Sequence, residues 1–312
     1  MKNFNIFVDS SANIPEELRK ARDIHVIPYH CTVNGEDRLC YDKNVSFEKT
    51  ALAHYELLRR GEDVKTSLIS SMAFYDALEP TVREGQDAII VTISSGVSGT
   101  YKQATDAAKM LMEKYTGRKV LVCDSANASM GEGMIALRIA DLRDMGESIE
   151  ACVQWCADNA YKLNSFFTVD DLKYLNRSGR ISKTVAIAGT LLNVKPILQA
   201  DGSNNAKITA FSKTRGRRKA LAAIADIFSE RVDRPDSPVA ITHADCLEDA
   251  KLLGDMLRER GAKEIIIEYY DLCTVSHVGP GTLALFFWGK DRRSALPVAE
   301  AQLARKTVTK RV

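Results

Sequence analysis

The chain has 312 residues, of which 45% are hydrophobic and 27% charged, and its formal net charge is +2. This composition argues against a disordered chain, and the small net charge argues against a dedicated nucleic-acid binder. The length is enough for one large or two medium domains. No apolar run approaches the roughly 20 residues that span a bilayer, and residues 6–8 already form an expected strand, so we expect no signal peptide.

Small polar turns follow the expected strands of the N-terminal half. We expect strands at residues 6–8, 24–33, 88–92 and 119–123, and helices at residues 47–60, 72–83 and 148–162. A repeated order of strand, polar turn and helix predicts a parallel sheet with its loops on one rim. The turn after the first strand carries Asp9, which we interpret as a structural hydrogen-bond acceptor rather than a catalytic group.

The loop at residues 91–101 has the densest set of hydroxyl and glycine residues: Ser94, Ser95, Gly96, Ser98 and Gly99. A strand that leads into a helix through such residues aims N–H and O–H donors at one point, which suits a carboxylate or phosphate. Helix capping and turn formation explain the same residues equally well. The loop at residues 64–71, which contains Thr66 and Ser67, is also rich in hydroxyls and favours a shared oxyanion pocket.

Composition changes in the second half. The polar, basic segment 176–183 is a fair junction between domains, and an apolar helix is expected at residues 185–193. A hairpin pairs residues 196–198 with 207–212, followed by helices at 216–231 and 247–260 and strands at 239–243 and 264–270. These elements predict a second, smaller α/β unit with a mixed sheet. We divide the chain into residues 1–165, residues 166–289 and a basic tail at residues 290–312.

His277 is expected after a strand, held by the rigid turn Gly279-Pro280-Gly281. We favour a functional role for it, whereas His25, His30 and His54 are interpreted as structural and His243 as ambiguous. Serine and histidine together suggest a hydrolase. The sequence lacks a Gly-x-Ser-x-Gly elbow, however, and Asp271 lies six residues from His277 with no evident reach. Neither nucleotide-binding glycine motif is present.

Cysteines and basic runs add little chemistry. The seven cysteines lack CxxC spacing, so no metal site is expected and reduced thiols in a cytoplasm are favoured. The run at residues 215–219 is interpreted as a solvated helix face and the tail as disordered or partly helical. Docking of the tail to a partner or to an anionic membrane surface is a hypothesis. The basic residues of the tail are Lys290, Arg292, Arg293, Arg305, Lys306, Lys310 and Arg311.

Six segments of the sequence form a distinctive set when taken together: Asp9–Pro15, Lys65–Ser67, Ser94–Tyr101, Leu175–Ile181, Asn193–Leu198 and His277–Thr282. They resemble the DegV family, bacterial fatty-acid-binding proteins that partner a fatty acid kinase. The resemblance runs in order from about residue 4 to about residue 288, and the tail has no counterpart in it. One departure is Leu68-Ile69-Ser70, where the family usually has Gln-Pro-Ser.

The resemblance implies an N-terminal α/β/α domain with a parallel sheet and a smaller C-terminal α/β domain with a mixed sheet. A long-chain fatty acid lies in a buried tunnel between them. Thr66 and Ser95 are implied to hydrogen-bond its carboxyl group, with His277 as third partner and Ser94 and Ser67 beside them. Arg180 and Arg177 are implied to dock the kinase, which uses ATP to form an acyl phosphate for phospholipid metabolism.

The physical chemistry agrees with a binding protein that has no catalytic residue, metal or cofactor. Each buried methylene contributes about 0.8 kcal/mol, and hydroxyls with a histidine offset the cost of burying a carboxyl group. No activated nucleophile is needed if another enzyme acts on the carboxyl group. The alternatives are a Ser/His acyl hydrolase or a phosphotransferase using the same pocket, and a nucleic-acid module using residues 215–219.

Overall fold

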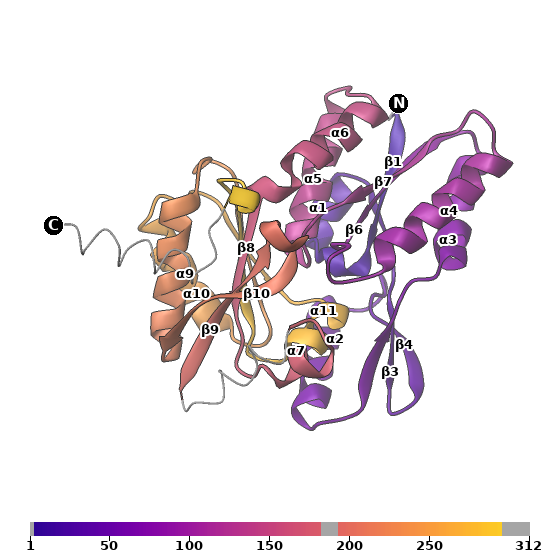
Figure 1. Ribbon diagram of the computed structural model, residues 1–312. Coiled ribbons are helices and arrows are strands. Elements are labelled where there is room, and N and C mark those ends of the chain that lie inside the picture. Colours follow the sequence, from indigo (N-terminus) through magenta and orange to yellow (C-terminus); the bar gives the residue numbers. More distant parts are fainter. Residues whose placement is uncertain (1–2, 182–192, 295–312) are drawn as a thin grey trace.

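The N-terminal domain is built on a parallel sheet in the computed structural model, which describes residues 3–181 and 193–294 (Figure 1). Its four strands have the order β2-β1-β6-β7, and every neighbouring pair is parallel. Their residues are mostly apolar and buried because helices cover both faces. The strands are β1 (Phe4–Asp9), β2 (Ile24–Ile27), β6 (Asp87–Thr92) and β7 (Val120–Asp124).

Two pairs of helices enclose this sheet. Helices α3 (Ser71–Arg83) and α4 (Thr100–Lys114) pack together on one face, and α5 (Met130–Asp144) and α6 (Ile149–Asn159) pack on the other (Figure 1). The short α1 (Glu16–Ala21) leads into β2. The three-layer α/β/α arrangement of the N-terminal domain is therefore confirmed. No helix in the described part of the chain is both long and apolar enough to cross a bilayer.

A small antiparallel sheet of order β4-β3-β5 projects from this domain. The predicted single strand over residues 24–33 is wrong: β2 and β3 (His30–Val33) belong to different sheets, with Pro28 between them. Proline has no N–H to donate and interrupts the ladder. Residues 64–67, expected as a loop, form β5 (Val64–Ser67); β4 (Glu36–Leu39) and α2 (Phe47–Arg59) complete the region.

The C-terminal domain contains a six-stranded sheet of order β10-β9-β8-β13-β11-β12. Only β11 and β12 pair in parallel, so the predicted mixed sheet is confirmed. Helices α9 (Arg217–Arg231) and α10 (Leu247–Arg258) cover one face. The boundary that we placed after residue 165 falls inside β8. The strands are β8 (Leu163–Thr168), β9 (Val194–Asp201), β10 (Lys207–Arg215), β11 (Val239–His243), β12 (Ile265–Tyr269) and β13 (Leu283–Trp288).

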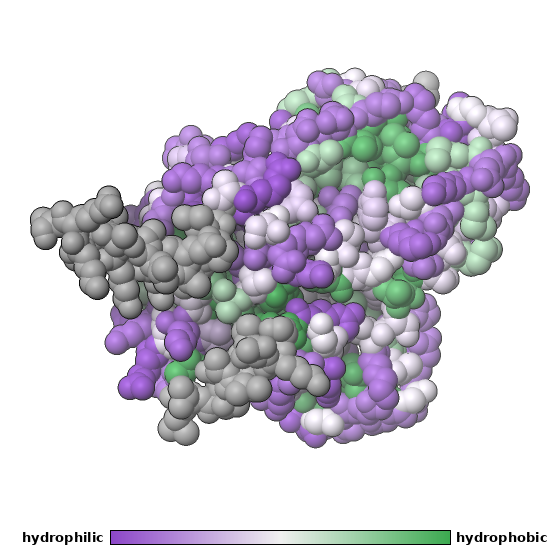
Figure 2. Space-filling view, viewed as in Figure 1, coloured by the Kyte–Doolittle hydropathy of each residue, from purple (hydrophilic) through white to green (hydrophobic). Residues whose placement is uncertain are grey.

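Helix α5 joins the two domains, because it contacts β1 and β6 on one side and β8, β11 and β13 on the other. Glycines make this approach close enough. A Cβ on Gly131 would lie 2.8 Å from the Phe286 ring, and one on Gly133 would lie 2.4 Å from the Ala12 carbonyl oxygen. One hydrophobic core consequently runs through both domains. Figure 2 shows apolar residues on this face of the molecule near the junction of the domains as well.

Short elements complete the fold: α7 (Lys173–Arg177), α11 (Leu272–Val278), and the turns η1 (Ser10–Ala12), η2 (Ala160–Lys162), η3 (Gly202–Asn204) and η4 (Arg292–Ser294). The sequence places Arg292 in a disordered or partly helical tail, but in the structure it lies in η4 and is only 2% exposed, so a disordered tail is wrong for this residue. Most of the expected helix at 185–193, and tail residues 295–312, lie outside the described residues. The basic run at residues 215–219 was interpreted as a solvated helix face. Within it, Arg217 donates a hydrogen bond to Asp249 at 2.8 Å and is therefore paired with a carboxylate.

Candidate functional site

The Thr66 side chain meets His277 where the two domains adjoin. The Oγ1 atom of Thr66 lies 2.8 Å from Nε2 of His277, although the two residues are 211 positions apart in sequence. Thr66 lies on β5, paired with Cys31 of β3, and His277 lies in the last turn of α11. His277 follows β12 (Ile265–Tyr269) in the chain, as expected, but helix α11, which was not predicted, lies between that strand and the glycine turn.

Helix α11 is fixed at both ends. Asp271 caps it, since its carboxylate accepts a hydrogen bond from the Thr274 backbone N–H at 2.7 Å. Gly279 ends it with a φ of +84°, where a Cβ would lie 2.2 Å from the Tyr174 ring. Gly281 has a φ of +78° and packs equally closely on Asp170. The Gly-Pro-Gly turn thus holds His277 rigidly, as its sequence predicts.

His277 is neutral at physiological pH. Burial and the positive charges of Arg180 and Arg177 lower the pKa of His277 to about 4. Its Nδ1 atom is buried and has no hydrogen-bond partner among the described residues. Within residues 3–181 and 193–294, no carboxylate accepts a hydrogen bond from His277, as the acid of a Ser-His-acid triad would.

A cavity of about 90 Å³ opens beside this pair. Thr66, Ser67 and His277 contribute polar atoms to its wall, and Arg180 adds a positive charge. Arg180 is half-buried, and Nη1 of its guanidinium donates to the Ser178 carbonyl oxygen. Four of the residues predicted from the sequence are therefore brought together here. Arg177 is exposed instead, with its guanidinium carbon 5.6 Å from the centre of the Tyr174 ring.

A second cavity, of about 50 Å³, adjoins the first. The two cavities share part of their walls, and we refer to them together as the path. The shared lining residues are Val97, Ala128, Ile208, Thr274 and Val278. The second cavity is mostly apolar and ends among residues of the C-terminal sheet and the loop after β7. These residues include Asn127, Ser165, Phe167, Ala200 and Phe286.

Residues of the loop at 91–101, which we call the serine loop, have different roles in the structure. Ser94 lines the second cavity, and its Oγ accepts a hydrogen bond from the Gly96 backbone N–H at 3.1 Å. Ser95 lines neither cavity, and its backbone N–H donates to Asp124 at 3.2 Å. Asp9 accepts from the Ile93 backbone N–H at 2.9 Å, which confirms its predicted structural role. Ser98, not singled out as a site residue, lines the first cavity.

Sequence reasoning also missed Tyr29. It lines the first cavity, and its hydroxyl contacts Oγ1 of Thr100, which in turn lies 2.9 Å from Oγ of Ser98. Tyr29 follows Pro28 at the break between two strands, where the sequence shows no distinctive pattern. Ser98 could have been selected, because it belongs to the same hydroxyl-rich loop as Ser94 and Ser95.

Two larger clefts, of about 390 Å³ and 240 Å³, lie elsewhere and contain none of the predicted ligand-binding residues. Within residues 3–181 and 193–294, no group of three or more potential metal-ligating side chains is found. The structure thus defines a class: a two-domain α/β protein with a buried interdomain path, polar at one end and apolar at the other.

Comparisons with known proteins agree with this class. The model of the DegV family, described as an uncharacterised protein family, matches residues 3–290. A DegV domain-containing protein of Clostridium perfringens is 36% identical over 291 residues, covering 93% of this chain and 98% of the relative. The chain therefore belongs to the DegV family.

Solved structures of family members share the fold. A Thermus thermophilus DegV protein, described for its fatty acid binding, is 26% identical with a TM-score of 0.80, covering 92% of this chain and 100% of that one. DegV of Bacillus subtilis, described as a fatty acid binding protein, is 29% identical with a TM-score of 0.78, covering 93% and 100%.

We predict that NMR titration of the ligand-free protein will place the pKa of His277 near 4. Replacing Arg180 with alanine should raise this pKa, because a neighbouring positive charge disfavours the imidazolium form. Because the pKa is lowered by folding, His277 costs stability only as pH falls from about 6.5 toward 4. Arg293→Ala, which removes a charge on the η4 turn, should leave the pKa unchanged. A wild-type midpoint near 6.5 would show that His277 is solvated.

Proposed function

We propose that this protein binds a long-chain fatty acid between its two domains. The observation that carries the proposal is the Thr66–His277 pair at the polar end of a path whose continuation is largely apolar. The carboxyl group lies at this pair, and the acyl chain extends past Val97 and Val278 toward Phe286. The fatty-acid-binding relatives support the same ligand class.

Protonation of His277 determines how the pair receives a carboxylate. With the imidazole neutral, the tautomer protonated at Nε2 donates to Thr66 Oγ1 and leaves the threonine O–H to donate to the ligand. The unpartnered Nδ1 is then an acceptor, which is cheaper to bury than an N–H with no acceptor. Arg180 balances the negative charge, and Ser67 and Ser98 offer further hydroxyls at the cavity wall.

The acyl chain supplies most of the binding free energy. At about 0.8 kcal/mol per buried methylene, burial of a long acyl chain contributes more free energy than ordering the ligand costs. We propose Ser95 as a further ligand of the carboxyl group. Because Ser95 lines neither cavity, it reaches the carboxyl group only if its loop shifts on binding. Ser94 contacts the chain rather than the carboxyl group.

We further propose that the protein is a carrier rather than an enzyme, and that a fatty acid kinase phosphorylates the bound acid for phospholipid metabolism. No carboxylate of the described residues orients His277, which disfavours the acyl hydrolase alternative. Arg177 is exposed close to the cavity wall that Arg180 forms, where a docking kinase can contact it. A cytoplasmic location is consistent with seven cysteines that form no disulfide.

We predict that native mass spectrometry of the purified protein will show one bound fatty acid. Thr66→Val, which removes only the hydroxyl, should raise the Kd for that acid by about 10- to 100-fold, the value of a hydrogen bond to a charged group. Thr66→Ser retains the hydroxyl and serves as the matched control. An empty wild-type protein that also refuses added fatty acids would refute the proposed function.

For the kinase partnership, Arg177→Ala should lower the rate of acyl phosphate formation by a fatty acid kinase and leave the fatty acid Kd unchanged. Arg180→Ala should change both quantities, because Arg180 also lines the cavity. Lys102→Ala, on α4, is the control for a general loss of surface charge. Unchanged rates in the Arg177 variant would exclude it from docking.

A further inference from the structure

Arg292 is a buried cation in the η4 turn, at the very end of the described chain. Its guanidinium donates to three backbone carbonyl oxygens: Ala200 at 2.5 Å, Ala126 at 2.8 Å and Ala160 at 3.4 Å. These carbonyls come from β9 of the C-terminal domain, from the loop after β7 in the N-terminal domain, and from η2 between them. A single side chain therefore ties together three segments that are far apart in sequence.

This arrangement is costly. Within residues 3–181 and 193–294, Arg292 makes no ion pair with a carboxylate, and burial lowers its pKa to about 10. Its Nε has no hydrogen-bond partner in the same residues, and the Tyr161 ring centre lies 5.4 Å from its guanidinium carbon. Backbone carbonyl oxygens rather than a hydrogen-bonded carboxylate therefore compensate the cost of burying this charge.

The segments that Arg292 holds together form the inner wall of the path. Ala200 lines the second cavity and also accepts from Arg292. Asn127, which follows Ala126, lines the same cavity, and its side-chain amide donates to the Ala160 carbonyl that Arg292 shares. Arg292 thus lies behind the end of the path that is remote from Thr66 and His277.

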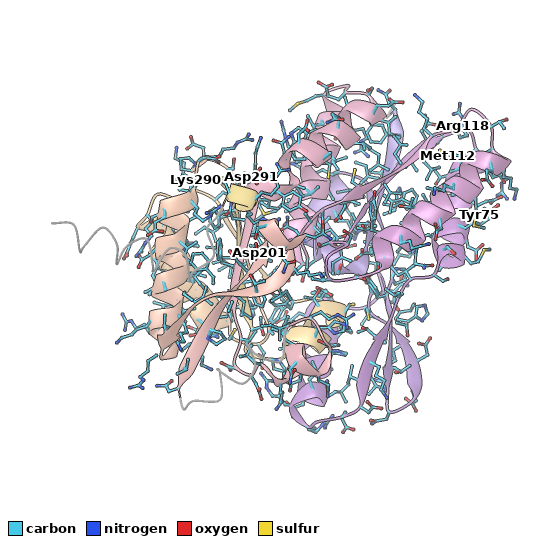
Figure 3. All side chains as sticks on the ribbon, viewed as in Figure 1. Tyr75, Met112, Arg118, Asp201, Lys290 and Asp291 are labelled. Atoms are coloured by element: carbon cyan, nitrogen blue, oxygen red, sulfur yellow. The ribbon has the colours of Figure 1, made fainter. Side chains whose placement is uncertain are left out.

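The end of the β9–β10 hairpin packs closely against Arg292. A Cβ on Gly202 would lie 2.5 Å from the carbonyl carbon of Arg292, and one on Gly96 would lie 1.8 Å from the Asn205 carbonyl oxygen. The hairpin end therefore sits between the serine loop and η4. The η3 turn at the hairpin end contacts η4. Figure 3 labels Asp201, which precedes η3, and Asp291, which precedes η4.

We propose that Arg292 is a positioning residue that closes the inner end of the fatty acid path and so sets the longest acyl chain that the protein accepts. This inference rests on the proposed function. Arg292 does not touch the ligand; it holds Asn127 and Ala200 at the separation that ends the cavity. It lies just beyond residues 3–290, the span that matches the family model.

The test is a ladder of saturated fatty acids from 12 to about 22 carbons, with Kd measured for the full-length protein. In the wild type, Kd should fall about fourfold per methylene until the chain fills the path, and then stop falling. Arg292→Met removes all the donors while keeping an unbranched side chain. We expect it to move this break to chains longer by about two carbons or more.

Arg293→Met is the matched control, because Arg293 is 51% exposed and pairs with Asp291 rather than with the wall. If Arg292→Met does not fold, Arg292→Lys and Gly202→Ala, which pushes η4 away, should move the break in the same direction. A variant that weakens every chain length equally, or leaves the break in place, overturns the inference. A wild type that binds none of the acids overturns the proposed function instead.

Discussion

A hydrogen bond between residues 211 positions apart holds only if the two domains keep one arrangement, and the Thr66–His277 contact depends on this. Bonds around α11 supply the constraint. The side chain of Asn13 donates to the Tyr269 carbonyl at 2.7 Å and accepts from the Asp271 backbone N–H at 2.6 Å. Tyr55 donates to the Tyr270 carbonyl at 2.6 Å. These bonds therefore hold α11, and with it His277, against the domain that carries Thr66.

Buried carboxyl groups beneath the site show how the interior tolerates polar residues. Ser11 bridges Asp9 and Glu132, and burial raises the pKa of Asp9 to about 6 and that of Glu132 well above its usual range. Both shifts favour the protonated carboxyl group, because burial disfavours the charged form. Asp9 in turn holds the strand end that leads into the serine loop.

Much of the architecture follows from local pattern, whereas contacts between distant segments do not. Alternation of apolar strands, polar turns and helices was enough to predict the parallel sheet and the mixed sheet. The break between β2 and β3 and the strand that contains Thr66 were not predicted, because four-residue strands show little periodicity. The roles of Thr66 and His277 came from the family resemblance rather than from spacing. Arg292 was predicted to be one of several basic residues in the tail, because no sequence pattern around it indicates burial.

We propose that the carboxyl group of the fatty acid lies at Thr66 and His277 and that its methyl end lies near Phe286 and Ala200. The most direct test is to measure intermolecular NOEs from a fatty acid labelled with ¹³C at carbon 2 and at its terminal methyl. We predict contacts from carbon 2 to the Thr66 methyl and His277 ring protons, and from the terminal methyl to Phe286 and Ala200. Contacts in the reverse order, or to residues of either larger cleft, would contradict the account.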